Sequence, residues 1–215
     1  MIRAVFFDLD GTLVRYHGVA FESTWGALGA AAGVGPLWDE LLDRYRGRLD
    51  EYPNWVRENA ALLRGVPVAR VVPALFPPPY APGAPEALTE LRRAGYILGI
   101  VSSGVSLVAE WVRRDLALSF AVANELLTAA GRFTGEAVVR VGLADKLGVV
   151  EQQANRLGLS LDQIAFVGDH LNDIPVFRAV GHAIAYAPKV PEVAAAARTV
   201  VHHFQPIPEL VRSAS

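Results

Sequence analysis

The stretch Ile2-Arg3-Ala4-Val5-Phe6-Phe7, followed by Asp8-Leu9-Asp10-Gly11-Thr12, decides the fold of this chain. A short apolar run that stops at a polar turn is typical of a strand buried on both faces of a parallel sheet. If the chain stays extended, the two acids project to the same side. Like charges at a buried strand end repel, and a hard cation relieves the repulsion. The stretch therefore predicts a buried strand that ends at a cation site, with an acidic turn or helix N-cap as the alternative.

Similar runs recur along the chain. Residues 96–101 end at Ser102-Ser103-Gly104, and residues 164–167 end at Gly168-Asp169. Weaker strand patterns cover residues 118–123 and 181–187. Helical patterns lie between these runs, at 84–94, 106–116, 146–157 and 173–179. Strands that alternate with helices predict an α/β fold, a doubly wound Rossmann-like parallel sheet.

One segment breaks this alternation. Residues 16–78 hold helical patterns at 21–32, 37–45 and 54–63, and no buried strand separates them. The proline-rich stretch 77–83 then stops any helix. We therefore predict an α/β core domain made of residues 1–15 and 79–215, and a small inserted α-helical cap domain made of residues 16–78.

Composition excludes several classes of protein. The 215 residues are 52% hydrophobic and carry a net charge of −2 from 20 basic and 22 acidic residues, which gives no polybasic signal for nucleic acid or anionic membrane. Cysteine is absent, which removes disulfides, thiolate zinc sites and cysteine nucleophiles. No stretch approaches the ~20 apolar residues of a membrane span, and the apolar start is too short for a signal peptide. We expect a cytoplasmic protein without nucleic-acid or membrane partners.

Polar residues follow the predicted strands, where ligands bind in a doubly wound sheet. The hydroxyl of Ser102 and the neighbouring backbone N–H groups suit a phosphate oxygen, with a plain helix N-cap as the alternative. Lys146 could neutralise a phosphate, although a lone lysine is more often a surface residue. Asp169 is well placed to ligate a cation, with Asn172 or Asp173 behind it; a polar loop that caps the next helix is the alternative.

Taken in order, these residues resemble the haloacid dehalogenase superfamily, in its phosphatase branch. The motifs that carry the resemblance are Asp8-Leu9-Asp10-Gly11-Thr12-Leu13, Ser102, Lys146, and Gly168-Asp169 with Asp173. The resemblance spans residues 1–14 and 80–203 and puts the inserted helices where this superfamily carries its cap. Within the superfamily, Ala123-Asn124-Glu125-Leu126 and Gly131-Arg132-Phe133-Thr134-Gly135 are similar to the phosphoserine phosphatase group.

The resemblance implies a mechanism. Asp8 would attack phosphorus and become an aspartyl phosphate, while Asp10 would protonate the leaving alkoxide and then activate water. Mg²⁺ would be the cofactor, and Ser102 and Lys146 would hold the transferring oxygens. The implied metal residues are Asp8, Asp10 through its carbonyl, Asp169 and Asp173. Ser103, Gly104 and Asn172 are the implied substrate-binding residues of the core.

The cap carries the features that bear on the leaving group. Gly47-Arg48-Leu49 followed by Arg57 resembles the segment in which phosphoserine phosphatases grip the substrate carboxylate. Where that group has a glutamate for the substrate amine, this chain has Arg15-Tyr16-His17-Gly18, and the nearest acid is Glu22. His17, Glu22 and Arg57 are therefore the cap residues that we expect to recognise the substrate.

The expected partner is a small phosphorylated metabolite, with phosphoserine as one candidate. A phosphotransferase such as a sugar-phosphate mutase, or a phosphatase for phosphoglycolate or a nucleotide, is the alternative on the same scaffold. A non-catalytic binding protein is the alternative of another class. Both a monomer and a homodimer agree with the sequence.

Overall fold

The fold is built on one sheet, described in a computed structural model that covers residues 1–214. The sheet has seven strands in the order β4-β3-β2-β1-β5-β6-β7, and every neighbouring pair is parallel except β3 with β4. The predicted α/β fold with a mostly parallel sheet is confirmed. The strands are β1 Ala4–Phe7, β2 Ile97–Val105, β3 Phe120–Ala129, β4 Arg132–Val138, β5 Ile164–Gly168, β6 His182–Tyr186 and β7 Thr199–Val201.

The first strand lies at the centre of the sheet. Ala4 pairs with Ile97 of β2 on one side and with Ile164 of β5 on the other. Val5 and Phe7 pack into one hydrophobic cluster, whereas Ala4 and Phe6 pack into a second cluster. The two clusters lie on opposite faces because side chains alternate along a strand. Both faces of β1 are therefore buried, which explains its nearly continuous apolar sequence.

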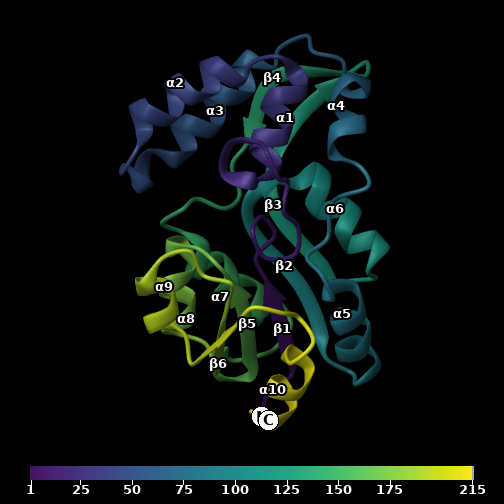
Figure 1. Cartoon of the computed structure of the whole chain (residues 1–215), viewed down its shortest axis with the longest axis vertical. Helices are drawn as coiled ribbons and strands as arrows, with labels where there is room; N and C mark the ends of the chain where they lie inside the picture. Colours follow the sequence, from purple (N-terminus) through teal and green to yellow (C-terminus); the bar gives the residue numbers. More distant parts are fainter. Residues whose placement is uncertain (215) are drawn as a thin grey trace.

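Helices cover both faces of the sheet (Figure 1). One face carries α5 Ala84–Arg93, α6 Ser106–Asp115 and α10 Ile207–Ser213, and the other carries α7 Lys146–Arg156, α8 Ile174–Phe177 and α9 Pro191–Ala196. The helix predicted over residues 173–179 is shorter than expected and follows a 3₁₀ turn, Leu171–Asp173. This turn forms because the Asp173 carboxylate accepts the backbone N–H groups of Asp169 and His170.

The inserted segment is helical, as its pattern indicates. It contains α1 Thr24–Ala32, α2 Gly35–Tyr45, α3 Tyr52–Leu62 and α4 Val68–Leu75, with short 3₁₀ turns at Ala20–Glu22 and Leu49–Glu51. The sequence pattern missed α4, which contains Pro73 in its interior. The exact division between core and cap stays a prediction.

A long β-hairpin links the two parts of the molecule. Strand β3 continues six residues past its predicted end at 123, and β4 was not predicted. The hairpin extends beyond the core and lies against the inserted helices (Figure 1). Its backbone bonds the chain after α3, with Gly65 N–H donating to the Phe133 carbonyl at 2.9 Å and Phe133 N–H donating to the Val66 carbonyl at 3.0 Å. The cap is therefore tied to the core by backbone hydrogen bonds as well as by its two linkers.

No helix within residues 1–214 combines the length and the apolar character that a bilayer crossing requires.

Candidate active site

Three neighbouring parallel strands bring the predicted site residues together. Asp8 follows β1, Ser102 lies on β2, and Asp169 follows β5. Lys146 is the first residue of α7. The structure corrects one expectation, because β2 does not end at Val101 but continues to Val105. Its register against β3 shifts between Val101 and Val105, so the backbone around Ser102 leaves the regular ladder there.

A buried acidic cluster forms the centre of the site. One carboxylate oxygen each of Asp8, Asp169 and Asp173 lies within 4.8 Å of the other two, and all three residues are buried. The Nζ atom of Lys146 lies 2.9 Å from Asp8 Oδ1 and 2.6 Å from Asp173 Oδ1. Three carboxylates against one ammonium leave two negative charges without a partner if all are ionised. Burial, and then the charges of Asp8 and Asp173, raises the pKa of Asp169 well above its usual value.

The donor set fits a hard divalent cation, since all three side chains offer oxygen ligands and carry excess negative charge. The three carboxylates differ in what they already bind. Asp173 accepts the backbone N–H groups of Asp169 and His170, each at 3.0 Å, and pairs with Lys146. Because both of its oxygens are engaged, Asp173 orients the loop and the lysine. Asp8 and Asp169 are the carboxylates with the most capacity left for a cation, and the Thr12 hydroxyl orients Asp169 at 3.0 Å.

Asp10 is separate from this cluster. An extended chain would place both acids on one side, but the Asp10 carboxylate is not part of the group of three. It accepts the backbone N–H of Thr24 at 2.6 Å and also the Thr24 hydroxyl. Burial raises the pKa of Asp10 to about 7, although the bonds from Thr24 lower it. Asp10 therefore holds a proton near neutral pH, which suits a general acid.

Two glycines allow the close approach of these groups. Gly11 has φ +86°, and a Cβ atom there would overlap the Asp169 carboxylate. A Cβ atom at Gly104 would overlap the carboxylate of Asp10. Any larger residue at either position would push a carboxylate out of place, so both glycines are needed to assemble the site.

The carbonyl of Ser103 is where the cap contacts the core site. It accepts hydrogen bonds from Trp25 Nε1 at 3.2 Å, from the Tyr52 hydroxyl at 2.5 Å and from Asn124 Nδ2 at 2.8 Å. Trp25 belongs to α1 and Tyr52 to α3, whereas Asn124 belongs to β3. Next to this carbonyl, the Ser102 hydroxyl accepts the Gly104 N–H at 3.1 Å. Two cap helices thus hold the backbone of residues 102–104.

Sequence reasoning missed Thr24, Trp25, Tyr52 and Asn124 as residues that support the site. Thr24 and Trp25 follow shortly after Arg15-Tyr16-His17-Gly18, where the sequence departs from the phosphoserine phosphatase pattern, and Asn124 lies in the stretch 123–126 that resembles it. These two signals pointed to the right segments. They did not indicate which atoms the side chains bind.

The predicted substrate-binding residues lie in different surroundings. Asn172 is buried, and its Nδ2 lies 3.4 Å from Ser103 Oγ, at the site. His17 is exposed and pairs with Glu22 at 3.2 Å, and Glu22 also pairs with Lys189 of the core at 2.9 Å. Arg57 is exposed on α3 and donates to Asn54 Oδ1 at 3.1 Å. A role for these three cap residues in substrate binding stays a prediction.

Comparison with known proteins assigns the family. The family model described as haloacid dehalogenase-like hydrolase matches residues 5–178. The chain belongs to this family.

Named relatives and solved structures agree with that assignment. The chain is 29% identical over 189 residues to a phosphoserine phosphatase of Methanocaldococcus jannaschii, covering 87% of this chain and 86% of that protein. It is 30% identical over 190 residues to a phosphoserine phosphatase of Lactococcus lactis, covering 88% of this chain and 85% of that protein. A solved structure of a substrate-bound phosphoserine phosphatase complex superposes with a TM-score of 0.82 at 25% identity, covering 98% of this chain and 99% of that one. Other relatives are longer, and the chain spans about half of their length. The predictions of a haloacid dehalogenase-like hydrolase and of a phosphatase similar to phosphoserine phosphatase are confirmed.

Proposed function

We propose that this chain hydrolyses a small phosphomonoester through a covalent phosphoryl group on Asp8, with Mg²⁺ as cofactor. The observation that carries the proposal is the contrast between two neighbouring acids. The carboxylate of Asp8 lies in a buried cluster, and its Oδ1 is 2.9 Å from the Nζ atom of Lys146. Asp10, two residues on, has a pKa of about 7 and holds a proton near neutral pH. A carboxylate held beside a lysine and a neighbouring acid that carries a proton suit the roles of nucleophile and general acid.

Each residue then has a defined task. Asp8 attacks phosphorus, and the P–O bond to the leaving group breaks while Asp10 gives its proton to the departing alkoxide. Asp10, now ionised, takes a proton from the water that attacks the phosphoryl group, and Asp8 is released. Lys146, the Ser102 hydroxyl and the backbone N–H groups nearby stabilise the charge on the transferring oxygens. Thr24 keeps Asp10 oriented through both steps.

The cation would be held by the carboxylates of Asp8 and Asp169 and the backbone carbonyl of Asp10. When bound, Mg²⁺ supplies positive charge that lets an anionic nucleophile approach an anionic phosphate. Asp173 would keep Lys146 and the loop before α8 in place.

Phosphoserine is the first substrate to test, because the named relatives are phosphoserine phosphatases and the match covers nearly their whole length in M. jannaschii and L. lactis. The sequence departs from that group at Arg15-Tyr16-His17-Gly18, and the nearest acid, Glu22, pairs with His17 and Lys189. The leaving group therefore needs a direct measurement.

The test is phosphate release from a panel of phosphomonoesters with Mg²⁺, including phosphoserine, phosphothreonine, phosphoglycolate, sugar phosphates, nucleotides and a generic aryl phosphate. We expect Mg²⁺-dependent release that EDTA and Asp8→Asn abolish and that Asp162→Asn, a change at an exposed acid, leaves intact. Near-normal turnover by Asp8→Asn would overturn the mechanism. Transfer of the phosphoryl group between carbons without release would instead identify a mutase, and no reaction with any ester would favour a binding protein.

A further inference from the structure

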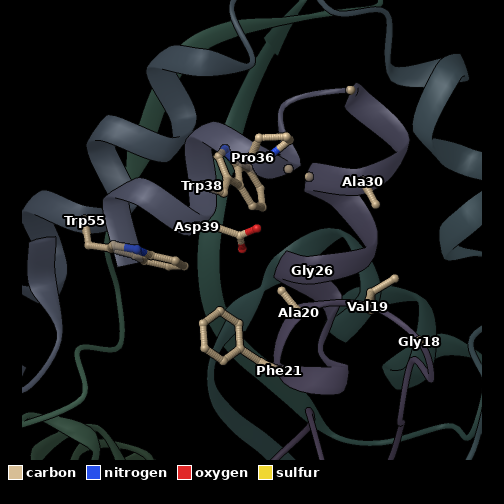
Figure 2. A pocket seen from close by; sticks show the side chains of 13 residues that line it. Gly18, Val19, Ala20, Phe21, Gly26, Ala30, Pro36, Trp38, Asp39 and Trp55 are labelled. Atoms are coloured by element: carbon tan, nitrogen blue, oxygen red, sulfur yellow. The ribbon is translucent and has the colours of Figure 1, made fainter. Parts of the chain in front are cut away.

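A cavity lies within the cap. It has a volume of about 370 Å³ and is bounded by α1, α2, the turn 18–21 and one residue of α3 (Figure 2). Small-molecule pockets commonly have volumes of about 300–1,000 Å³, so a small ligand would fill this one. None of its lining residues takes part in the proposed phosphoryl transfer.

Three aromatic residues are among those that line the cavity, and the rest are mostly glycine and alanine. Phe21, Trp38 and Trp55 line the cavity, and Trp25 packs edge-on against both tryptophans, with ring centroids 5.6 Å from Trp38 and 5.2 Å from Trp55. Trp38 lies directly on the backbone of α1, because a Cβ atom at Gly29 would overlap its ring. The rings of Trp38 and Trp55 are therefore held in place before any ligand binds.

Phe21 lies at the rim of the cavity, with an exposed ring and a left-handed backbone conformation. Its side chain is 54% exposed, and its backbone has φ +59°, a left-handed conformation that bulky residues seldom adopt. Strained backbone of this kind persists at ligand-binding sites, where the position of the side chain matters. Figure 2 shows the ring of Phe21 on the side of the cavity opposite Trp38.

The single charge in the cavity wall is negative. Asp39 lines the cavity, is exposed and makes no ion pair within residues 1–214, and no lysine, arginine or histidine lines the cavity. Figure 2 shows its carboxylate between the rings of Trp38 and Phe21. Trp38 and Trp55 are each only 6% exposed, and neither indole N–H has a hydrogen-bond partner in the described chain.

We propose that the pocket formed by Phe21, Trp38, Asp39 and Trp55 binds a small organic cation with an alkylated ammonium group. Aromatic faces attract ammonium groups through the ring quadrupole, and this is the arrangement by which proteins recognise quaternary ammonium compounds. The carboxylate adds a direct charge attraction. The cation is either a free ligand or the leaving group of the phosphomonoester, and the second case rests on the proposed function.

Choline and 3,3-dimethylbutan-1-ol provide a matched pair of probes, since they share shape and hydroxyl and differ in charge. Binding is followed by tryptophan fluorescence of the full chain, because Trp38 and Trp55 line the pocket. We expect choline to bind about tenfold more tightly than the neutral alcohol, and Asp39→Asn to weaken choline binding about tenfold. Glu40→Gln, which removes the adjacent exposed acid outside the pocket, should leave binding unchanged. Phe21→Leu should weaken choline binding several-fold.

Equal binding of the two probes, an Asp39→Asn variant that binds choline like the unaltered protein, or no saturable binding at millimolar choline would overturn the proposal. None of these readouts requires turnover, so they stand even if the proposed phosphatase function fails.

A kinetic comparison identifies the source of the cation. If it is the leaving group, kcat/KM for phosphocholine exceeds that for 3,3-dimethylbutyl phosphate, and Asp39→Asn removes the difference. If it is a separate ligand, the two esters react alike while choline still binds.

Discussion

Replacing Lys146 with methionine tests the electrostatic design of the site most directly. The Lys146 side chain has 0% exposure and lies 2.9 Å from Asp8 Oδ1 and 2.6 Å from Asp173 Oδ1. Burial alone would lower its pKa, but the charges of Asp173 and Asp8 outweigh burial and raise the pKa above its usual value. The lysine is therefore charged at every pH at which the protein would be studied. Methionine keeps the volume of the stem and removes only the charge.

The expected loss is large because buried carboxylates are left without a counter-charge. Removing one partner of a buried ion pair costs about 3–5 kcal/mol. For a chain of this size 1 kcal/mol corresponds to about 2–4 °C, so the melting temperature in EDTA should fall by roughly 6–20 °C. The loss should be smaller at pH 6 than at pH 8, because the carboxylates can take up protons instead. Added Mg²⁺ should restore part of the stability, since it would compensate the same charges.

Urea or thermal unfolding of the full chain in EDTA measures this loss, and Lys189→Met is the matched control. Lys189 makes an ion pair of similar length, 2.9 Å to Glu22, but its side chain is 56% exposed. Water screens such a pair, so its removal should change stability much less. If Lys146→Met is no more destabilising than Lys189→Met at pH 8, the buried cluster is not held together by this charge.

Three further predictions concern single contacts around the site. Between pH 5.5 and 8, the metal-free folded protein binds more protons at Asp10 than the unfolded chain does, because the folded pKa is about 7 against 3.8. The free energy of unfolding should therefore fall by about 2 kcal/mol between pH 5.5 and 8. Asp10→Asn should remove this pH dependence. If the difference in free energy of unfolding between the unaltered protein and Asp10→Asn instead rises with pH, the raised pKa of Asp10 is contradicted. Thr24→Val removes the hydroxyl bonded to Asp10 and should lower kcat about tenfold with little change in KM, whereas unchanged kcat would show that the backbone N–H suffices. Asn124→Ala removes one of three side-chain donors to the Ser103 carbonyl, the side-chain donor to the Val141 carbonyl, and the acceptor of the Arg140 and Val141 N–H groups. We expect it to cost about 3 kcal/mol in urea unfolding, and a loss below about 1 kcal/mol would mean that water replaces the amide.

The sequence by itself determined the core of this protein. The apolar residues 4–7 identified the central strand because burial on both faces of a parallel sheet leaves no place for a polar residue. Asp8, Ser102 and Asp169 could be grouped because neighbouring parallel strands end at one edge of the sheet. The motifs around Asp8, Lys146 and Asp169 also carried the family resemblance. All of these inferences depend on local patterns and on one general property of sheets.

The tertiary structure alone decided the contacts between cap and core. Thr24 bonds Asp10 across 14 positions, while Tyr52 and Trp25 reach the Ser103 carbonyl across 51 and 78 positions. Strand β4 and the aromatic cavity of the cap have the same origin, since each forms only when distant segments pack together. Periodicity reports which face of an element is buried, but it does not report what that face meets. The partners of a side chain are set by the packing of whole elements, and for this reason the substrate end of the site could not be derived from the sequence.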